Sequence, residues 1–147
     1  MRRYERTRVL VEGDPLVLRE IVGEVEREAG AGAVEVLDEP HEELVMVQVR
    51  ETAQGSLFYL GEALATSCRV RLGDAVGLGL LLGSDRCRAY ELAVVDAAFA
   101  GEAGAARAQK WEARLAAEGE RIAARERAEA QRAATTRVDF DTLAVEL

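Results

Sequence analysis

Four apolar runs between residues 33 and 82 constrain the fold more than any other feature of this sequence. The runs cover residues 33–37, 44–50, 57–72 and 76–82. In the third run, Cys68, Val70 and Leu72 alternate with two arginines, which is the two-residue period of a strand with one buried face. Parallel strands need a crossover of a dozen or more residues, and the intervening segments are too short for one. The sequence therefore predicts four antiparallel strands.

Turn residues separate these runs. We expect turns at Asp38–His41, at Gln54–Gly55 and at Gly73–Asp74, the last of which is a compact hairpin signal. The run at residues 57–72 is long for one strand, and we expect a bend or bulge near Gly61.

Helical patterns flank the predicted sheet. A short helix over residues 6–11 precedes Asp14 and Pro15, which are a good N-cap and a good first helical residue. Apolar residues then recur at helical spacing as Leu18, Ile21, Val22 and Val25. The segment 29–32 holds two glycines and ends this helix. Asp85 caps a broadly apolar helix over residues 86–100, which we expect to pack on the sheet.

The composition changes after Gly101. Residues 101–136 hold seven basic and six acidic side chains, and the large apolar ones are Trp111, Leu115 and Ile122, on one narrow stripe of a helix. A helix over residues 105–134 would be about 45 Å long, whereas a compact globule of this size is about 38 Å across. We therefore expect the helix either to break at Gly119 or to lie on another protein, with the stripe as the partner contact; a solvated helix face is the alternative.

These patterns together predict an α+β fold: a four-stranded antiparallel sheet with helices packed on it and a long C-terminal helical extension. Residues 1–100 would form the sheet domain. Residues 101–147 would form the helical extension and a C-terminal docking tail, as part of the same functional unit.

Several function classes are excluded by simple counts. The net charge is −8 and no basic block is present, which disfavours nucleic-acid binding. The longest apolar stretch, residues 75–83, is too short to cross a membrane, and no apolar core follows the basic start. His41, Cys68 and Cys87 are the complete set of histidine and cysteine residues and cannot close a zinc site. We therefore assign no catalytic and no metal-binding residue, and we expect a cytoplasmic protein.

Two segments could hold a ligand. The glycines from Gly77 to Gly83 resemble a nucleotide-binding loop, but they lie within a predicted strand, which favours glycines that pack closely against a neighbour. The segment from Gly83 to Arg86 joins a strand to a helix start, where free backbone amides favour an anion. The competing interpretation is that Asp85 is the N-cap and already occupies these amides.

The segments 57–100 and 133–142 together resemble the PhnG family, whose members are subunits of the phosphonate carbon–phosphorus lyase system. The similar residues include Gly61–Thr66, Val70–Leu72, Gly83–Asp85 and, near the C-terminus, Arg137–Val138–Asp139–Phe140. Two positions depart from the family pattern: Ser67 and Ser84 stand where an arginine is common. From the similar segments we select Thr66, Asp85, Arg86, Arg137, Asp139 and Phe140 as candidate contacts to a ligand or partner.

The resemblance implies a role inside a complex. PhnG proteins join the PhnH, PhnI and PhnJ subunits, with two copies of each, and the system displaces adenine from MgATP with an alkylphosphonate. PhnI is credited with the nucleosidase-like step. The resemblance thus implies an accessory subunit without its own complete active site or cofactor, with PhnI as the main partner and MgATP as substrate of the complex. Two alternatives stay open: a protein that binds a nucleotide or phosphonate alone, and an unrelated helical adaptor.

Overall fold

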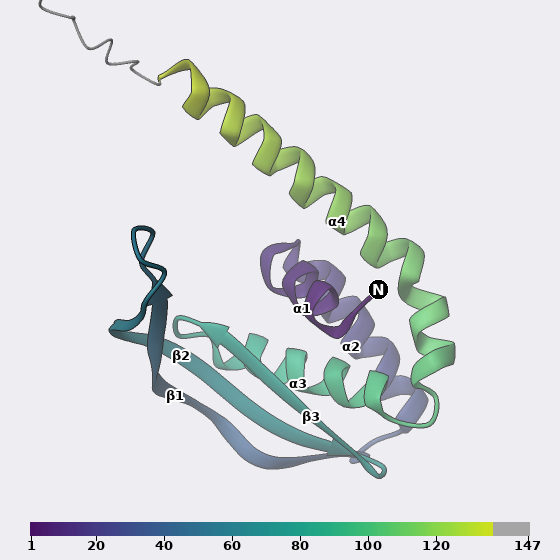
Figure 1. The fold of residues 1–147 in the computed structure, drawn as a ribbon. Coiled ribbons are helices and arrows are strands. Elements are labelled where there is room, and N and C mark those ends of the chain that lie inside the picture. Colours follow the sequence, from purple (N-terminus) through teal and green to yellow (C-terminus); the bar gives the residue numbers. More distant parts are fainter. Residues whose placement is uncertain (137–147) are drawn as a thin grey trace, which may run out of the picture.

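The computed structural model describes residues 1–136 and has an α+β architecture (Figure 1). Its elements follow the order α1 (Arg3–Glu12), α2 (Pro15–Ala29), β1 (Val34–Arg50), β2 (Leu57–Leu72), β3 (Ala75–Leu82), α3 (Arg86–Ala100) and α4 (Gly104–Thr135). The sheet is antiparallel with strand order β1-β2-β3. Helix α3 lies against one face of this sheet, and α1, α2 and α4 pack around α3 on the same side.

The sheet has three strands, so the prediction of four is wrong. The two runs at residues 33–37 and 44–50 form the single strand β1, and the expected turn at Asp38–His41 is an irregularity inside it. The pairing with β2 shifts between Val36 and Asp38 and again between Asp38 and His41. Pro40 lacks a backbone N–H, and an edge strand with a bulge accommodates that loss without reversing the chain.

The other turns are confirmed. Strands β2 and β3 are joined by Gly73 and Asp74, and Gly73 takes the left-handed φ of 61° that this tight turn needs. Val47 pairs with Gly61 while Gln48 pairs with Tyr59, which leaves Leu60 as an extra residue. The expected irregularity near Gly61 is therefore a bulge in β2.

Helix α3 approaches the sheet closely because β3 offers glycines to it. A Cβ atom on Gly77 would overlap the backbone of Ala93 and Ala97, and one on Gly79 would overlap the Ala89 carbonyl. The prediction of closely packed strand glycines is confirmed, and no room for a nucleotide remains on that side of β3. The predicted helix over residues 86–100 is also confirmed, with Asp85 accepting a hydrogen bond from the Arg88 amide at 2.9 Å.

Helices α1 and α2 meet at a compact corner. Asp14 caps α2, accepting from the Leu16 amide at 2.9 Å, and Pro15 is the first helical residue, as predicted. The predicted apolar face of α2 is buried. Helix α1 begins three residues earlier than expected. Its C-terminal carbonyls accept hydrogen bonds from the Arg88 guanidinium, which reaches Leu10 O at 3.0 Å and Val11 O at 2.6 Å.

Helix α4 runs 32 residues without a break at Gly119 and is about 48 Å long. Its first half packs on the other helices, so the core extends beyond the predicted boundary at residue 100. From Ala124 to Thr136 every residue is exposed. Within residues 1–136, no helix combines the length and apolar character needed to cross a membrane.

Candidate functional site

The junction between β3 and α3 is locked by its own side chains. Thr66 is fully buried, and its hydroxyl donates to the Gly83 carbonyl at 2.6 Å and accepts from the Asp85 amide at 3.2 Å. Asp85 in turn occupies the first turn of α3 as the N-cap. The predicted contacts Thr66 and Asp85 thus lie side by side, and both hold the loop rather than an open site.

Arg86, the third predicted contact in this region, is paired with β1. Its guanidinium donates to Glu42 at 3.2 and 2.6 Å, and the Ser84 hydroxyl donates to the same carboxylate at 3.0 Å. The Arg86 hydrogen bonds, followed by that of Ser84, lower the pKa of Glu42 to about 2. Because the cation is neutralised within the chain, the junction is poorly suited to an added phosphate or phosphonate.

A pocket of about 490 Å³ lies beside this junction, between α2, α3 and the irregular part of β1. Its polar groups pair with one another: Arg19 forms an ion pair with Glu91 at 3.4 Å, and the Tyr90 hydroxyl donates to Glu26 at 3.2 Å. Burial raises the pKa of Glu91, and Arg19 opposes that rise. The exposed Cys87 also lines this pocket. The two arginines in the lining, Arg19 and Arg86, are paired with Glu91 and Glu42, so neither is free to bind a phosphate.

The described residues contain no group of three or more His, Cys, Asp and Glu side chains arranged to hold a metal ion. His41 lies on β1, with Nδ1 at 2.8 Å from the Glu39 carbonyl oxygen. Cys68 is buried on β2, and burial is the main cause of its raised thiol pKa.

The predicted stripe of Trp111, Leu115 and Ile122 lies in the chain's own core. These side chains are 0%, 2% and 4% exposed. The Trp111 ring meets Phe99 edge-on with centroids 5.3 Å apart. The expectation that the stripe contacts another protein is therefore corrected. Although α4 is long, the other helices of the same chain already cover the three side chains of its stripe, so these side chains have almost no exposed surface to offer a partner.

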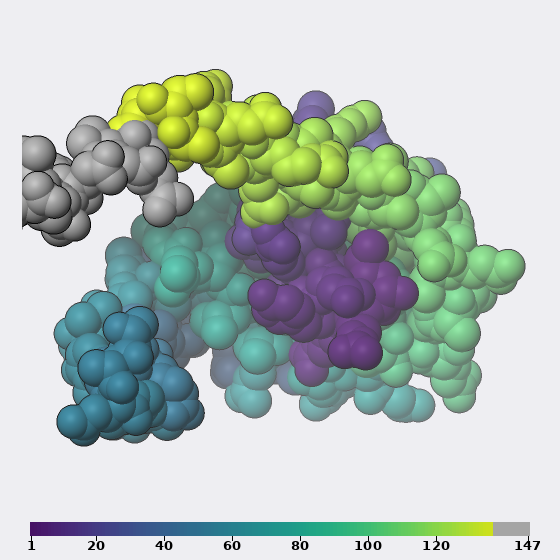
Figure 2. All heavy atoms as spheres, turned by 45° about the horizontal axis from the view of Figure 1, so that its top comes forward, coloured from purple at the N-terminus to yellow at the C-terminus, as the bar shows by residue number. Residues whose placement is uncertain are grey.

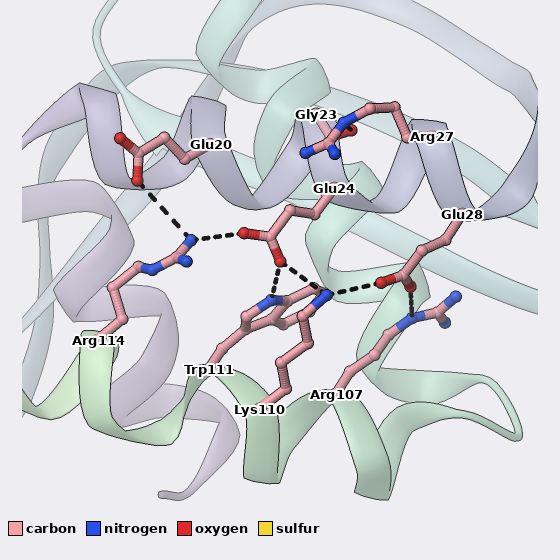
Figure 3. A network of polar contacts seen from close by, with 9 residues as sticks. All are labelled: Glu20, Gly23, Glu24, Arg27, Glu28, Arg107, Lys110, Trp111 and Arg114. Carbon is pink, nitrogen blue, oxygen red and sulfur yellow. Dashed lines mark hydrogen bonds and ion pairs between the residues drawn. The ribbon is translucent and has the colours of Figure 1, made fainter.

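A polar network, drawn in Figure 3, fixes α4 along α2. The carboxylate of Glu24 accepts from Trp111 Nε1 at 2.8 Å, pairs with Lys110 Nζ at 2.9 Å and pairs with Arg114 at 3.0 Å. These bonds, that of Trp111 first, lower the pKa of Glu24 to about 2. Lys110 also bonds Glu28 at 2.7 Å. The network is structural, and it employs the chain's single lysine.

The outer face of the sheet, opposite α3, carries an exposed apolar row. Val76, Leu78, Leu80 and Leu82 are 47%, 45%, 44% and 71% exposed, and their alternation with Gly77 and Gly79 explains why they point away from the helices. We call these four residues the β3 row. Sequence reasoning missed it, although the alternation of glycine with leucine in residues 77–80 carried the signal.

The remaining predicted contacts, Arg137, Asp139 and Phe140, lie outside the described residues. The structure therefore brings Thr66, Asp85 and Arg86 together at one junction and does not test the C-terminal group.

Comparison with known proteins gives two matches. The family described as "Phosphonate metabolism protein PhnG" matches residues 1–145. The chain is 40% identical over 105 residues to a Rhizobium meliloti (strain 1021) protein named "Alpha-D-ribose 1-methylphosphonate 5-triphosphate synthase subunit PhnG". The aligned part covers 71% of this chain and 65% of that relative, so it spans slightly less than two thirds of the relative's length.

Proposed function

The chain belongs to the PhnG family, and from this premise we propose that it is an accessory subunit of the synthase that attaches an alkylphosphonate to ribose C1 of ATP and releases adenine. In this proposal MgATP is a substrate of the whole complex. The chain contributes no catalytic residue and binds no cofactor alone. Its partners are the other subunits of the carbon–phosphorus lyase system, PhnI above all and also PhnH and PhnJ, with two copies of each, in the cytoplasm.

The observation that carries the proposal is the β3 row. Four neighbouring aliphatic side chains, each 44% to 71% exposed, form a continuous apolar strip on a strand at the sheet edge. An exposed strip of this kind is typical of a surface that a partner covers. Beside the strip, Arg69 pairs with Asp38 and Arg71 with Glu35 at 2.8 Å. The outer face therefore offers a neutralised, partly apolar surface that suits a protein better than a charged small molecule.

The junction between β3 and α3 also favours a docking role, because it is poorly equipped to bind a small ligand. Thr66, Asp85 and Arg86 are each engaged by groups of the chain itself. A protein that bound a nucleotide or phosphonate by itself would need free donors, and this junction provides few. We therefore favour a docking role over independent ligand binding.

The direct test is assembly. The chain is co-expressed with PhnH, PhnI and PhnJ from the same source, with the affinity tag on PhnI, and the eluate is resolved by size. We expect the chain to elute with PhnI in a stable complex. Elution as a free monomer would contradict the proposal.

Two variants locate the contact. Leu78→Lys with Leu80→Lys places charge on the β3 row and is expected to reduce co-purification strongly, whereas the control Leu16→Lys changes an isolated exposed leucine on α2, 59% exposed, and is expected to have no effect. Deletion of residues 134–147 is expected to abolish co-purification with PhnI. It removes no buried residue among those described, so circular dichroism should remain that of the intact fold.

Calorimetry distinguishes the proposed accessory subunit from a protein that binds a nucleotide by itself. The isolated chain titrated with MgATP at millimolar concentration is expected to give no binding heat. A saturable signal would favour a nucleotide-binding protein that acts alone.

A further inference from the structure

The distal half of the β1–β2 ribbon, residues 43–64, extends beyond the rest of the sheet, and we call it the arm. Strand β3 ends at Leu82, opposite Ala65, so from Leu64 outward only two strands remain. In Figure 2 the arm, coloured blue, stands apart from the helices. Its pairing continues along the ribbon to Arg50 and Leu57.

The turn at the tip of the arm is held by specific hydrogen bonds. The Glu51 carboxylate accepts from the Ala53 amide at 2.9 Å and from the Gln54 amide at 2.5 Å. The Glu51 amide donates to the Ser56 carbonyl at 3.0 Å, and the Arg50 guanidinium donates to the Gly55 carbonyl. The end of the arm thus has specific stabilising contacts of its own, although it stands apart from the helices in Figure 2.

One face of the arm carries large exposed apolar side chains. The register pairs Leu44 with Leu64, Gln48 with Tyr59 and Arg50 with Leu57, so alternate residues share this face. Its apolar members are Leu44, Met46, Leu57, Tyr59 and Leu64, which are 45% to 64% exposed.

The opposite face is apolar as well. Val45, Val47 and Val49 alternate with the first set and are partly exposed, and Phe58, which pairs with Val49, is 43% exposed. An isolated two-stranded ribbon is at best marginally stable in water, and one with two apolar faces gains most from a partner that encloses it. A flat surface would cover one face only.

Charge selects the kind of partner. The arm holds three acidic residues, Glu43, Glu51 and Glu62, and one basic residue, Arg50. Glu43 and Glu62 lie near its base and Glu51 at its tip. Anionic lipid surfaces attract basic segments and would repel this element, as would nucleic acid. A protein groove with basic side chains at its rim complements it.

We propose that the arm inserts into an apolar slot with a basic rim on another subunit of the complex, where both of its faces become buried. This inference rests on the proposed function and adds to it: the arm is a contact distinct from the β3 row. The occupant of the slot is the arm of this chain, and the slot belongs to a different polypeptide.

The test uses the co-expressed complex. The variant Leu44→Thr, Met46→Thr and Tyr59→Thr keeps strand propensity and removes apolar area from one face. Loss of several buried anchors is expected to weaken assembly by at least ~100-fold. The matched control, Tyr4→Gln with Leu16→Gln, removes two exposed side chains from α1 and α2, 77% and 59% exposed, and is expected to assemble normally.

A second variant guards against misfolding. Residues 47–61 are replaced by Asn-Gly, so that Met46 and Glu62 flank a two-residue hairpin turn. The body of the protein should keep its thermal midpoint, because the outer part of the arm stands apart from the helices in Figures 1 and 2, while assembly is lost. For the rim, Glu43→Lys with Glu62→Lys is expected to slow association and to reverse its salt dependence.

The outcomes separate the two proposals. If the unaltered chain does not assemble, the proposed function fails and the arm's role fails with it. If the unaltered chain and both arm variants assemble equally well, the arm proposal is overturned and the proposed function stands. An arm-dependent dimer of the isolated chain, or arm-dependent binding to phosphatidylserine-containing vesicles, would also overturn it, because the occupant would then be a second copy or a membrane.

Discussion

The burial of Trp111 gives a prediction that can be worked through in detail. The side chain is fully buried, its ring lies edge-on to Phe99, and its Nε1 donates to Glu24 at 2.8 Å. Truncation of such a tryptophan to alanine typically costs ~3–5 kcal/mol. Total domain stability is usually about 5–15 kcal/mol, so Trp111→Ala should remove a large share of it.

The assay is thermal unfolding of the isolated chain, monitored by far-ultraviolet circular dichroism so that loss of the indole does not affect the signal. At ~2–4 °C per kcal/mol, the thermal midpoint should fall by about 6–20 °C. Trp111→Phe keeps a ring and loses the hydrogen bond, so it should cost only ~1–2 kcal/mol.

Leu16→Ala is the control, because Leu16 is 59% exposed and its truncation should cost at most ~0.5 kcal/mol. If Trp111→Ala also costs less than ~1 kcal/mol, the stripe of α4 is not part of this chain's core. The expectation that it faces a partner would then be restored.

Three further predictions concern stability. The pKa of Glu24 is lowered from 4.5 to about 2, so its stabilisation is present above pH ~4.5 and is lost as the pH falls through about 2. The shift corresponds to at most ~3 kcal/mol, reduced to ~1–2 kcal/mol by solvent screening, and Glu24→Gln should flatten acid unfolding in that range. Gly79→Ala should cost ~1–3 kcal/mol through its clash with α3, whereas Gly23→Ala on α2, where a Cβ meets nothing within 4 Å, should stabilise by ~0.5–1 kcal/mol in the same melts. Asp96→Ala should cost ~2–4 kcal/mol in urea unfolding, because it leaves the guanidinium of Arg6, 11% exposed, without its carboxylate; a neutral result would show that the pair is dispensable.

Local signals in the sequence predicted much of the fold. Asp14 with Pro15, and Asp85, fixed the starts of two helices, because capping acts within a few residues of the chain. The extra strand was predicted because Pro40 usually interrupts a strand. Only the pairing partner reveals that it lies in an edge strand that tolerates a bulge.

Long-range pairing was beyond sequence reasoning. Glu24 and Trp111 meet across 87 positions of the chain, and no local rule connects them. A signal did exist: α2 carries Glu20, Glu24 and Glu28 at helical spacing, and α4 carries basic residues at similar spacing. Complementary charged rows of that kind predict two helices lying side by side, and they would have placed the tryptophan stripe inside the chain.

The sequence offered Thr66, Asp85 and Arg86 as separate candidate contacts and gave no sign that they lie together. They meet at one junction, where each is hydrogen-bonded to a neighbour in the chain. Two apolar surfaces, the β3 row and the arm, support a docking role. Whether their side chains are exposed depends on which face of each strand is covered by α3. That information appears only once α3 is placed on the sheet.

Adenine release is the measurement that tests the proposed role most directly. The proposed partner subunits are supplied with MgATP and methylphosphonate, with and without this chain. We predict that release requires the chain, that the isolated chain releases none, and that the arm variants fail to restore it. Full release from a complex that lacks the chain, or release by the chain alone, would contradict the proposed role.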